Sequence, residues 1–130
     1  MSVVDSLVSF TRELASPAYG QVILGEGNTS GKDGDNLWIK ASGHPMSSIT
    51  SKGFVQVRTK ELVGFLDAPK PSDSKIREFL NASRVDQSAV VYPSTETLMH
   101  AWLLTLPGVG FVGHTHPMNT LGIMCGSRSE

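Results

Sequence analysis

The sequence is short of cysteine and of long apolar runs. Cys125 is the single cysteine among 130 residues, so an intrachain disulfide is excluded. No secretory apolar segment follows Met1, because Asp5 and Arg12 interrupt the first stretch. The longest largely apolar stretch, residues 101–113, is cut by proline and glycine and is shorter than the about 20 residues of a membrane span. A reducing, cytoplasmic location is therefore expected.

An excess of one charge is also absent. Eleven Lys and Arg residues stand against twelve Asp and Glu residues, which gives a formal net charge of -1 with histidine neutral. Neither sign gathers into a long run. The chain therefore lacks the basic patch of a nucleic-acid-binding protein and the polybasic segment of a protein that binds membrane surfaces. The sequence therefore favours a small molecule as the partner.

What is present is an ordinary globular composition with mixed periodicity. Hydrophobic residues make up 39% of the chain, and its length corresponds to one domain or part of one. Apolar positions at three- and four-residue spacing predict helices, and β-prone runs predict strands. The expected helices are 3–14, 59–66 with Thr59 as its cap, 74–81, 97–106 and one beginning at Met118, and the expected strands are 37–40, 54–57 and 109–116.

Three further features complete the expected fold. Residues 25–35 are rich in glycine and small polar side chains, which predicts a loop between two strands. Residues 67–74 have the composition of a surface loop. Apolar residues on nearly every side of 97–106 predict a buried helix. The order is mixed α and β, with a sheet that helices must cover on both faces.

The triplet His114-Thr115-His116 is a candidate metal site. Side chains two residues apart on a strand project from the same face, so the two imidazoles point the same way. Imidazole nitrogen is a common ligand of Zn²⁺, although a catalytic zinc site usually has three protein ligands. The alternative is a pair of hydrogen-bonded or exposed histidines at the end of a strand.

The triplet Ser94-Thr95-Glu96 precedes the expected buried helix. Its hydroxyls and amides would lie at the positive end of the helix dipole, where an anion such as phosphate is stabilised. Glu96 could also approach a metal held by the histidines, as a ligand or as a general base. The alternative is an ordinary helix cap with an acidic residue in the first turn.

The glycine-rich residues 25–35 do not form a known nucleotide loop. A P-loop would need glycine where Glu26 stands and Ser or Thr where Asp33 stands. A dinucleotide fingerprint should open a helix, whereas these glycines lead into a strand. What remains is a loop whose amides, with Asn28 and Ser30, could cradle an anion, or an ordinary tight turn.

Four motifs occur in a fixed order along the chain. They are Gly25-Glu26-Gly27-Asn28-Thr29-Ser30, Lys40-Ala41-Ser42-Gly43, Pro93-Ser94-Thr95-Glu96 and His114-Thr115-His116-Pro117. In this combination the chain resembles the class II aldolase/adducin family, and it is similar to the fuculose- and rhamnulose-1-phosphate aldolases. The resemblance covers most of the chain.

The resemblance implies a three-layer α/β/α fold with a mainly antiparallel central sheet, commonly assembled as a homotetramer. It implies a zinc-dependent lyase that cleaves a phosphorylated ketose through a metal-stabilised enediolate. An epimerase or dehydratase of the same family is an alternative. The implied sites are catalytic Glu96, a metal site of His114, His116 and Glu96 for Zn²⁺, and a sugar-phosphate site of Asn28, Ser42, Gly43, Ser94 and Thr95.

The family takes a third zinc-binding histidine from a position beyond the two on the strand. Neither His44 nor His100 matches that position. The resemblance therefore implies that residues 1–130 are the N-terminal portion of such a domain. Two other classes stay open at this point, which are a metal-dependent hydrolase and a non-catalytic adducin-like module.

Overall fold

The centre of the fold is an antiparallel sheet. The computed structural model describes residues 1–24, 26–67 and 69–126, and within them the strands follow the order β3-β2-β1-β4. All three strand pairings are antiparallel. The strands are β1 (Asn28–Asp33), β2 (Asn36–Lys40), β3 (Phe54–Arg58) and β4 (Phe111–His114). The mainly antiparallel sheet that the resemblance implied is confirmed.

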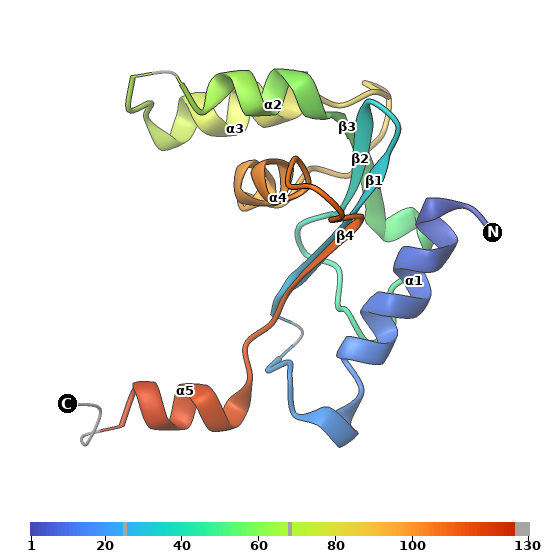
Figure 1. The fold of residues 1–130 in the computed structure, drawn as a ribbon, viewed down its shortest axis with the longest axis vertical. Helices are drawn as coiled ribbons and strands as arrows, with labels where there is room; N and C mark the ends of the chain where they lie inside the picture. The colour runs from blue at the N-terminus through green and yellow to red at the C-terminus, as the bar shows by residue number, and fades with distance from the viewer. Residues whose placement is uncertain (25, 68, 127–130) are drawn as a thin grey trace.

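Helices cover both faces of this sheet (Figure 1). On one side lies α1 (Val3–Leu14), and on the other lie α2 (Thr59–Phe65), α3 (Asp73–Ala82) and α4 (Thr97–Leu103). Successive side chains of β2 point to opposite faces of the sheet. Leu37 packs on the side of α2, α3 and α4, and Trp38 packs on the side of α1. The three-layer α/β/α fold is thus confirmed.

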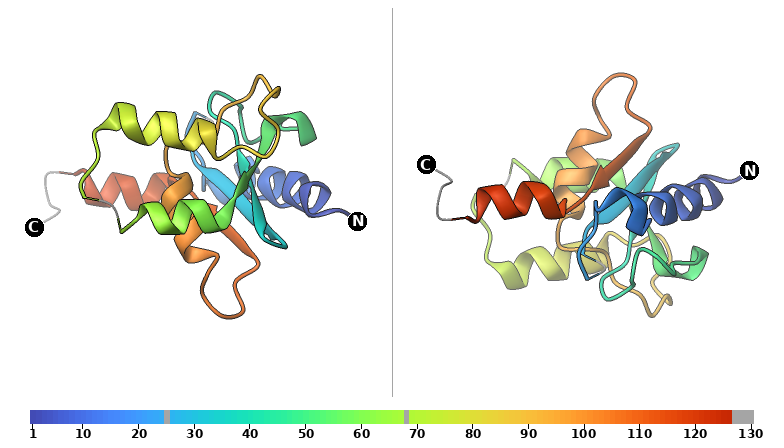
Figure 2. Two further views of the ribbon diagram at one scale, coloured as in Figure 1. Left: turned by 90° about the horizontal axis from the view of Figure 1, so that it is seen from above. Right: turned by 90° about the horizontal axis from the view of Figure 1, so that it is seen from below.

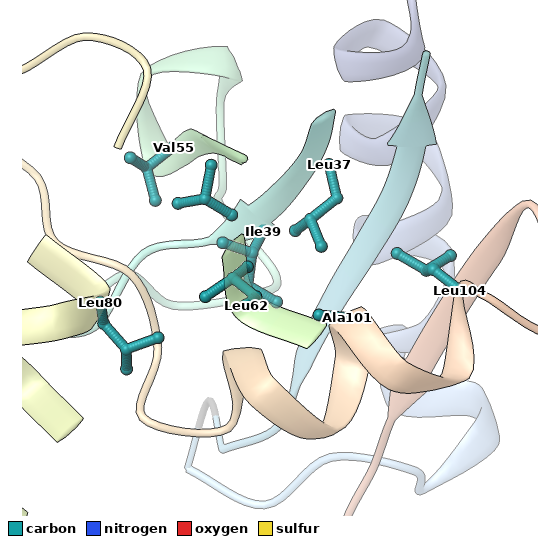
Figure 3. Packing of buried hydrophobic residues seen from close by; sticks show 8 residues of the cluster. Leu37, Ile39, Val55, Leu62, Leu80, Ala101 and Leu104 are labelled. Carbon is teal, nitrogen blue, oxygen red and sulfur yellow. The ribbon is translucent and has the colours of Figure 1, made fainter. Parts of the chain in front are cut away.

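The larger core lies between the sheet and helices α2, α3 and α4 (Figure 3). Its buried residues come from β2, β3, these three helices and the position directly after α4, and they are Leu37, Ile39, Val55, Val57, Leu62, Leu80, Ala101 and Leu104. A smaller cluster of Leu7, Ile49 and Phe54 lies on the α1 side. Burial of this apolar surface holds α4 against the sheet and so fixes one wall of the site described below.

The helix expected over residues 3–14 is confirmed with the same bounds. Ser2 caps it in a capping box with Asp5, and its buried face carries Leu7. The helix expected over 74–81 is confirmed as α3, which begins one residue earlier, and the strand expected over 54–57 is confirmed as β3. Thr59 is the first residue of α2 rather than its cap, since the cap position belongs to Arg58.

The loop expected over residues 25–35 was wrong, because β1 occupies most of it. Thr29, Ser30 and Gly31 are buried in the centre of the sheet. A Cβ at Gly31 would lie 2.8 Å from the Phe111 ring, so small side chains are needed here for close packing rather than for a turn. No strand precedes β1 within the described residues, and Gly25 lies outside them.

The ends of two other elements differ from expectation. The helix expected over 97–106 stops at Leu103, and it is not buried on all sides, because Met99 and Trp102 are about half exposed. β4 is shorter than the expected strand over 109–116 and ends at His114. The surface loop expected up to residue 74 gives way earlier to α3, with Ser72 as its cap.

The C-terminal helix α5 (Met118–Met124) projects away from the sheet (Figures 1 and 2). Ile123 and Met124 are exposed on it. Short 3₁₀ turns, η1 (Pro17–Tyr19) and η2 (Ser51–Gly53), connect the remaining segments. No described helix is both long enough and apolar enough to cross a membrane.

Candidate functional site

The site begins with two strand residues that face each other. Asn28 of β1 pairs with His114 of β4 in the antiparallel register, so their side chains lie on the same face of the sheet. That face belongs to α4. The neighbouring residues point to α1 instead, since Thr29 bonds Thr11 and a Cβ at Gly113 would meet Leu14.

Glu96, directly before α4, joins these two side chains. Its Oε2 accepts a hydrogen bond from Asn28 Nδ2, and it lies 2.7 Å from His114 Nδ1. Burial acts to raise the pKa of Glu96, but the hydrogen bonds from His114 and Asn28 outweigh it and hold the pKa below the usual glutamate value. The carboxylate is therefore ionised at neutral pH, which is the state that a general base requires.

The two histidines of the triplet lie side by side. The ring centroids of His114 and His116 are 4.7 Å apart, although His116 lies past the end of β4. His116 Nδ1 lies 3.3 Å from Glu26 Oε2, as His114 Nδ1 lies near Glu96. Each imidazole thus turns one nitrogen to a carboxylate and keeps Nε2 for another partner. Histidines that bind metals commonly have this arrangement.

This donor set fits a zinc ion in part. Two imidazoles with carboxylate partners are the ligand types that Zn²⁺ prefers. Across residues 1–24, 26–67 and 69–126, however, no group of three or more His, Cys, Asp or Glu side chains is placed to hold a metal. His44 contacts the Ser42 carbonyl, and His100 is fully buried against Ser30. Neither supplies the third ligand.

The residues expected at the phosphate site come together from three segments. An isolated bridge joins Ala41 to Pro93, and it brings the 42–43 turn beside the 94–95 turn. Ser42 N donates to Tyr92 O, and Ser94 Oγ accepts from Asn28 Nδ2 at 3.2 Å. Ser94 is buried, whereas Ser42 and Thr95 are exposed and line a cavity of about 280 Å³.

Gly43 and Asn28 have a more particular geometry. Gly43 has a φ of 77°, a left-handed conformation that favours glycine. The Asn28 amide nitrogen is engaged by Ser94 and Glu96, while its buried Oδ1 has no partner among the described residues. A sugar hydroxyl could donate to that oxygen, and Nδ2 would have to turn from Glu96 to reach a phosphate.

The sequence left open an anion cradle of loop amides with Asn28 and Ser30 or an ordinary tight turn, and the structure has a strand, β1, from Asn28 onwards. Ser30 pairs with Ile39 on one side and Val112 on the other. The backbone groups of Ser30 are therefore part of the sheet ladder and are not available to a ligand. The Asn28 side chain, on the α4 face of β1, faces the site.

Comparisons with known proteins identify the family of the chain. The sequence model of the Class II Aldolase and Adducin N-terminal domain matches residues 5–129. The chain belongs to this family. No curated protein shows significant sequence similarity to it.

Solved structures of the family share the fold. The N-terminal class II aldolase domain of a conserved protein from Thermoplasma acidophilum is 31% identical, with a TM-score of 0.82, and the match covers 97% of this chain and 60% of that one. An L-fuculose 1-phosphate aldolase is 18% identical, with a TM-score of 0.63, and the match covers 95% of this chain and 48% of that one.

The L-fuculose-1-phosphate aldolase from Thermus thermophilus is 16% identical, with a TM-score of 0.59, and the match covers 94% of this chain and 50% of that one. At these identities the two aldolases establish the fold. The chain spans about half to three fifths of the length of these relatives.

Two residues of this candidate site were not among the site residues predicted from the sequence. Lys40 is almost completely buried, and it lines a cavity of about 310 Å³ with Glu26, Gly43 and His44. Burial lowers the pKa of Lys40, an effect that the charge of Glu96 opposes. A lysine within a β-prone run directly before Ser-Gly was a usable signal. Glu26 lies within the first of the four motifs, but its contact with His116 depends on the fold and was not predicted.

Proposed function

We propose that the chain is the catalytic N-terminal portion of a zinc-dependent aldehyde-lyase that cleaves a phosphorylated ketose. The observation that supports this most is the meeting of Glu96 with His114 and Asn28, which come from separate elements. It places an ionised carboxylate beside a histidine pair suited to a metal. The fold shared with the L-fuculose 1-phosphate aldolase supports the class of substrate.

In this proposal His114 and His116 would hold Zn²⁺ through the nitrogens that their carboxylate partners leave free. Once bound, the cation would supply positive charge that stabilises the negative charge developing on the ketose oxygens. The Nδ1 contacts with Glu96 and Glu26 orient the two rings and fix the tautomer. Glu96 would serve as the group that removes or returns a proton at the reacting carbon, and to act as a metal ligand as well its carboxylate would have to turn away from His114 Nδ1.

The phosphate would be held by donors from the neighbouring turns. Ser94 Oγ accepts from Asn28 Nδ2 and from Glu96 N, so its hydroxyl hydrogen is free to donate to an anion. Ser42, Gly43 and Thr95 would add a hydroxyl, a close backbone approach and a second hydroxyl. We place the Lys40 ammonium as the charge that balances the anion, since it lines the cavity beside Gly43.

The same residues could serve an epimerase or a dehydratase, because each of these reactions would pass through a charge-stabilised carbanion next to a carbonyl. Product analysis separates these reactions. Cleavage yields two carbonyl fragments, epimerisation inverts one carbon and dehydration releases water. We also propose the homotetramer common in the family, whose neighbouring subunits would complete the substrate pocket.

The test is proton exchange on phosphorylated ketoses in deuterated water with zinc added. Glu96→Gln removes the base while keeping the size of the side chain, so exchange is expected to fall by about 100- to 10,000-fold. Glu61→Gln is the matched control, because Glu61 is exposed and pairs with Arg58 away from the site. Unchanged exchange in Glu96→Gln would remove Glu96 from the mechanism.

A further inference from the structure

Behind Glu96, helix α4 carries a second buried polar contact with β1. The His100 and Ser30 side chains are both fully buried, and His100 Nδ1 lies 2.8 Å from Ser30 Oγ. Ala101, which follows His100 on α4, and Leu104 one turn further on belong to the apolar core, whereas Met99 is about half exposed. A histidine–serine pair is therefore buried where apolar side chains would otherwise be expected.

This pair is costly to bury. His100 Nε2 has no hydrogen-bond partner in the part of the chain that the structure describes, and an unsatisfied buried polar atom destabilises a fold. Two apolar side chains of similar volume would fill the same space without that cost. Local features that oppose stability tend to occur at functional sites, where a particular geometry is required.

The His100–Ser30 contact completes a closed loop of linked residues that includes Glu96. Within α4 the His100 N–H donates to the Glu96 carbonyl at 3.2 Å. The Glu96 side chain reaches Asn28, and the His100 side chain reaches Ser30. Asn28 and Ser30 are two residues apart on β1, so they lie on the same face. Two points one helical turn apart on α4 are thus joined to two points on one strand.

The short length of α4 makes these two points important. The helix has seven residues, and Glu96 at its cap position makes no side-chain capping bond to the described residues. Apolar packing resists separation of the helix from the sheet but resists rotation and sliding less well, because it is not directional. Directional hydrogen bonds are what fix the rotation.

We infer that His100, held by Ser30, is a positioning residue that sets where the Glu96 carboxylate lies between Asn28 and His114. The inference rests on the proposed role of Glu96 as the proton-transferring group. Burial lowers the pKa of His100 to about 4, and the Glu96 and His114 charges act on it in opposite directions. The imidazole therefore stays neutral at pH 7 and adds no charge behind the carboxylate.

The experiment replaces the polar pair and measures two quantities. The double variant Ser30→Ala/His100→Leu removes the hydrogen bond and leaves no buried polar atom in its place. The matched control is Thr11→Val/Thr29→Val, which removes a buried hydroxyl pair on the opposite face of β1. His100→Asn keeps an amide where Nδ1 lies and should retain the bond to Ser30.

The first readout is NMR of the metal-free chain, which requires no activity. In Ser30→Ala/His100→Leu the resonances of the Asn28 side-chain amide and the His114 ring should shift. They should stay in place in the Thr11→Val/Thr29→Val control and in His100→Asn. If the pair of residues merely stabilised the core, the site resonances would not move in the folded double variant, and the inference would fail.

The second readout is whether the substitution changes kcat or KM. Misplacing Glu96 should lower kcat by about 10- to 100-fold, with little change in KM for the sugar phosphate, because the phosphate donors are untouched. Equal kcat in wild type and double variant would overturn the inference. An inactive wild type would overturn the proposed function instead, and the NMR result would still decide on positioning. If the double variant does not fold, Ser30→Ala alone is compared with His100→Asn.

Discussion

Ser94 joins two side chains of the site through one hydroxyl oxygen. Ser94→Ala removes the acceptor of Asn28 Nδ2 and, in the proposal, a donor to the substrate phosphate. We expect KM to rise about tenfold for a phosphorylated sugar, the effect of one lost hydrogen bond to a charged group. For the unphosphorylated sugar KM should change little. Equal changes for both sugars would limit Ser94 to a structural role in the turn before α4.

His100 should make the fold sensitive to acid. Its pKa is about 4 in the folded chain because of burial, against about 6.5 when unfolded. Below pH 6.5 the unfolded state binds the proton and the folded state does not, so stability falls as the pH falls towards 4. From pH 7 to pH 5 this one group should cost about 2 kcal/mol of unfolding free energy.

Urea unfolding at both pH values checks this expectation. The decrease in unfolding free energy between pH 7 and pH 5 should be smaller in His100→Leu than in wild type, because the variant has no buried imidazole to protonate. His44→Leu is the control, since His44 is only partly buried and should leave the loss unchanged. The same pH dependence in wild type and His100→Leu would contradict the burial account.

Individual residues of the candidate site could be proposed from the sequence where chemistry and spacing coincided. Glu96, His114 and Ser94 stood out because a carboxylate, an imidazole pair and a hydroxyl occurred in motifs of one family. Lys40 and the Ser30–His100 pair were not predicted, because their importance lies in burial. Burial of a polar residue depends on contacts between distant segments, and a single sequence does not display these.

At the scale of elements, Gly27 allows the backbone directly before β1 to lie close to the end of β4. It has a φ of 103°, and a Cβ there would lie 2.5 Å from the His114 carbonyl oxygen. Gly27→Ala should therefore destabilise the fold by roughly 2–4 kcal/mol, from backbone strain and overlap together. It should also displace His114 and weaken metal binding.

Gly64→Ala is the matched control for this substitution. Gly64 lies within α2, and no described atom lies within 4 Å of a Cβ added there. The change should stabilise the chain by roughly 0.5–1 kcal/mol, since alanine favours the helix. Thermal unfolding of both variants gives the comparison, and similar stabilities for the two would contradict the packing described for Gly27.

Helices were easier to predict than the first strand. Residues 3–14 carry a helical period and a capping box, both of which are local signals. β1 lacks any apolar alternation, because its buried positions hold Thr29, Ser30 and Gly31. These small residues are buried by neighbours from α1 and α4, so tertiary packing overrode the local preference for a loop.

At the scale of the whole molecule, the chain forms the three layers of its family and matches about half to three fifths of its solved relatives. The fold could be inferred from four ordered motifs before the strand order was known. What could not be inferred was how far β4 extends. β4 ends at His114. The His114 and His116 rings still lie close together, although His116 is not part of the strand.

The most direct test of the account is zinc binding to the chain, measured by competition with a chelator of known affinity. Wild type should bind zinc. His114→Ala and His116→Ala should each weaken zinc binding by roughly 100-fold or more, which exceeds the loss expected when a residue that only hydrogen-bonds a metal ligand is removed. His44→Ala should bind as wild type does, since His44 contacts Ser42 instead. Zinc binding that survives the double replacement of His114 and His116, or that is lost in His44→Ala, would contradict the proposed metal site.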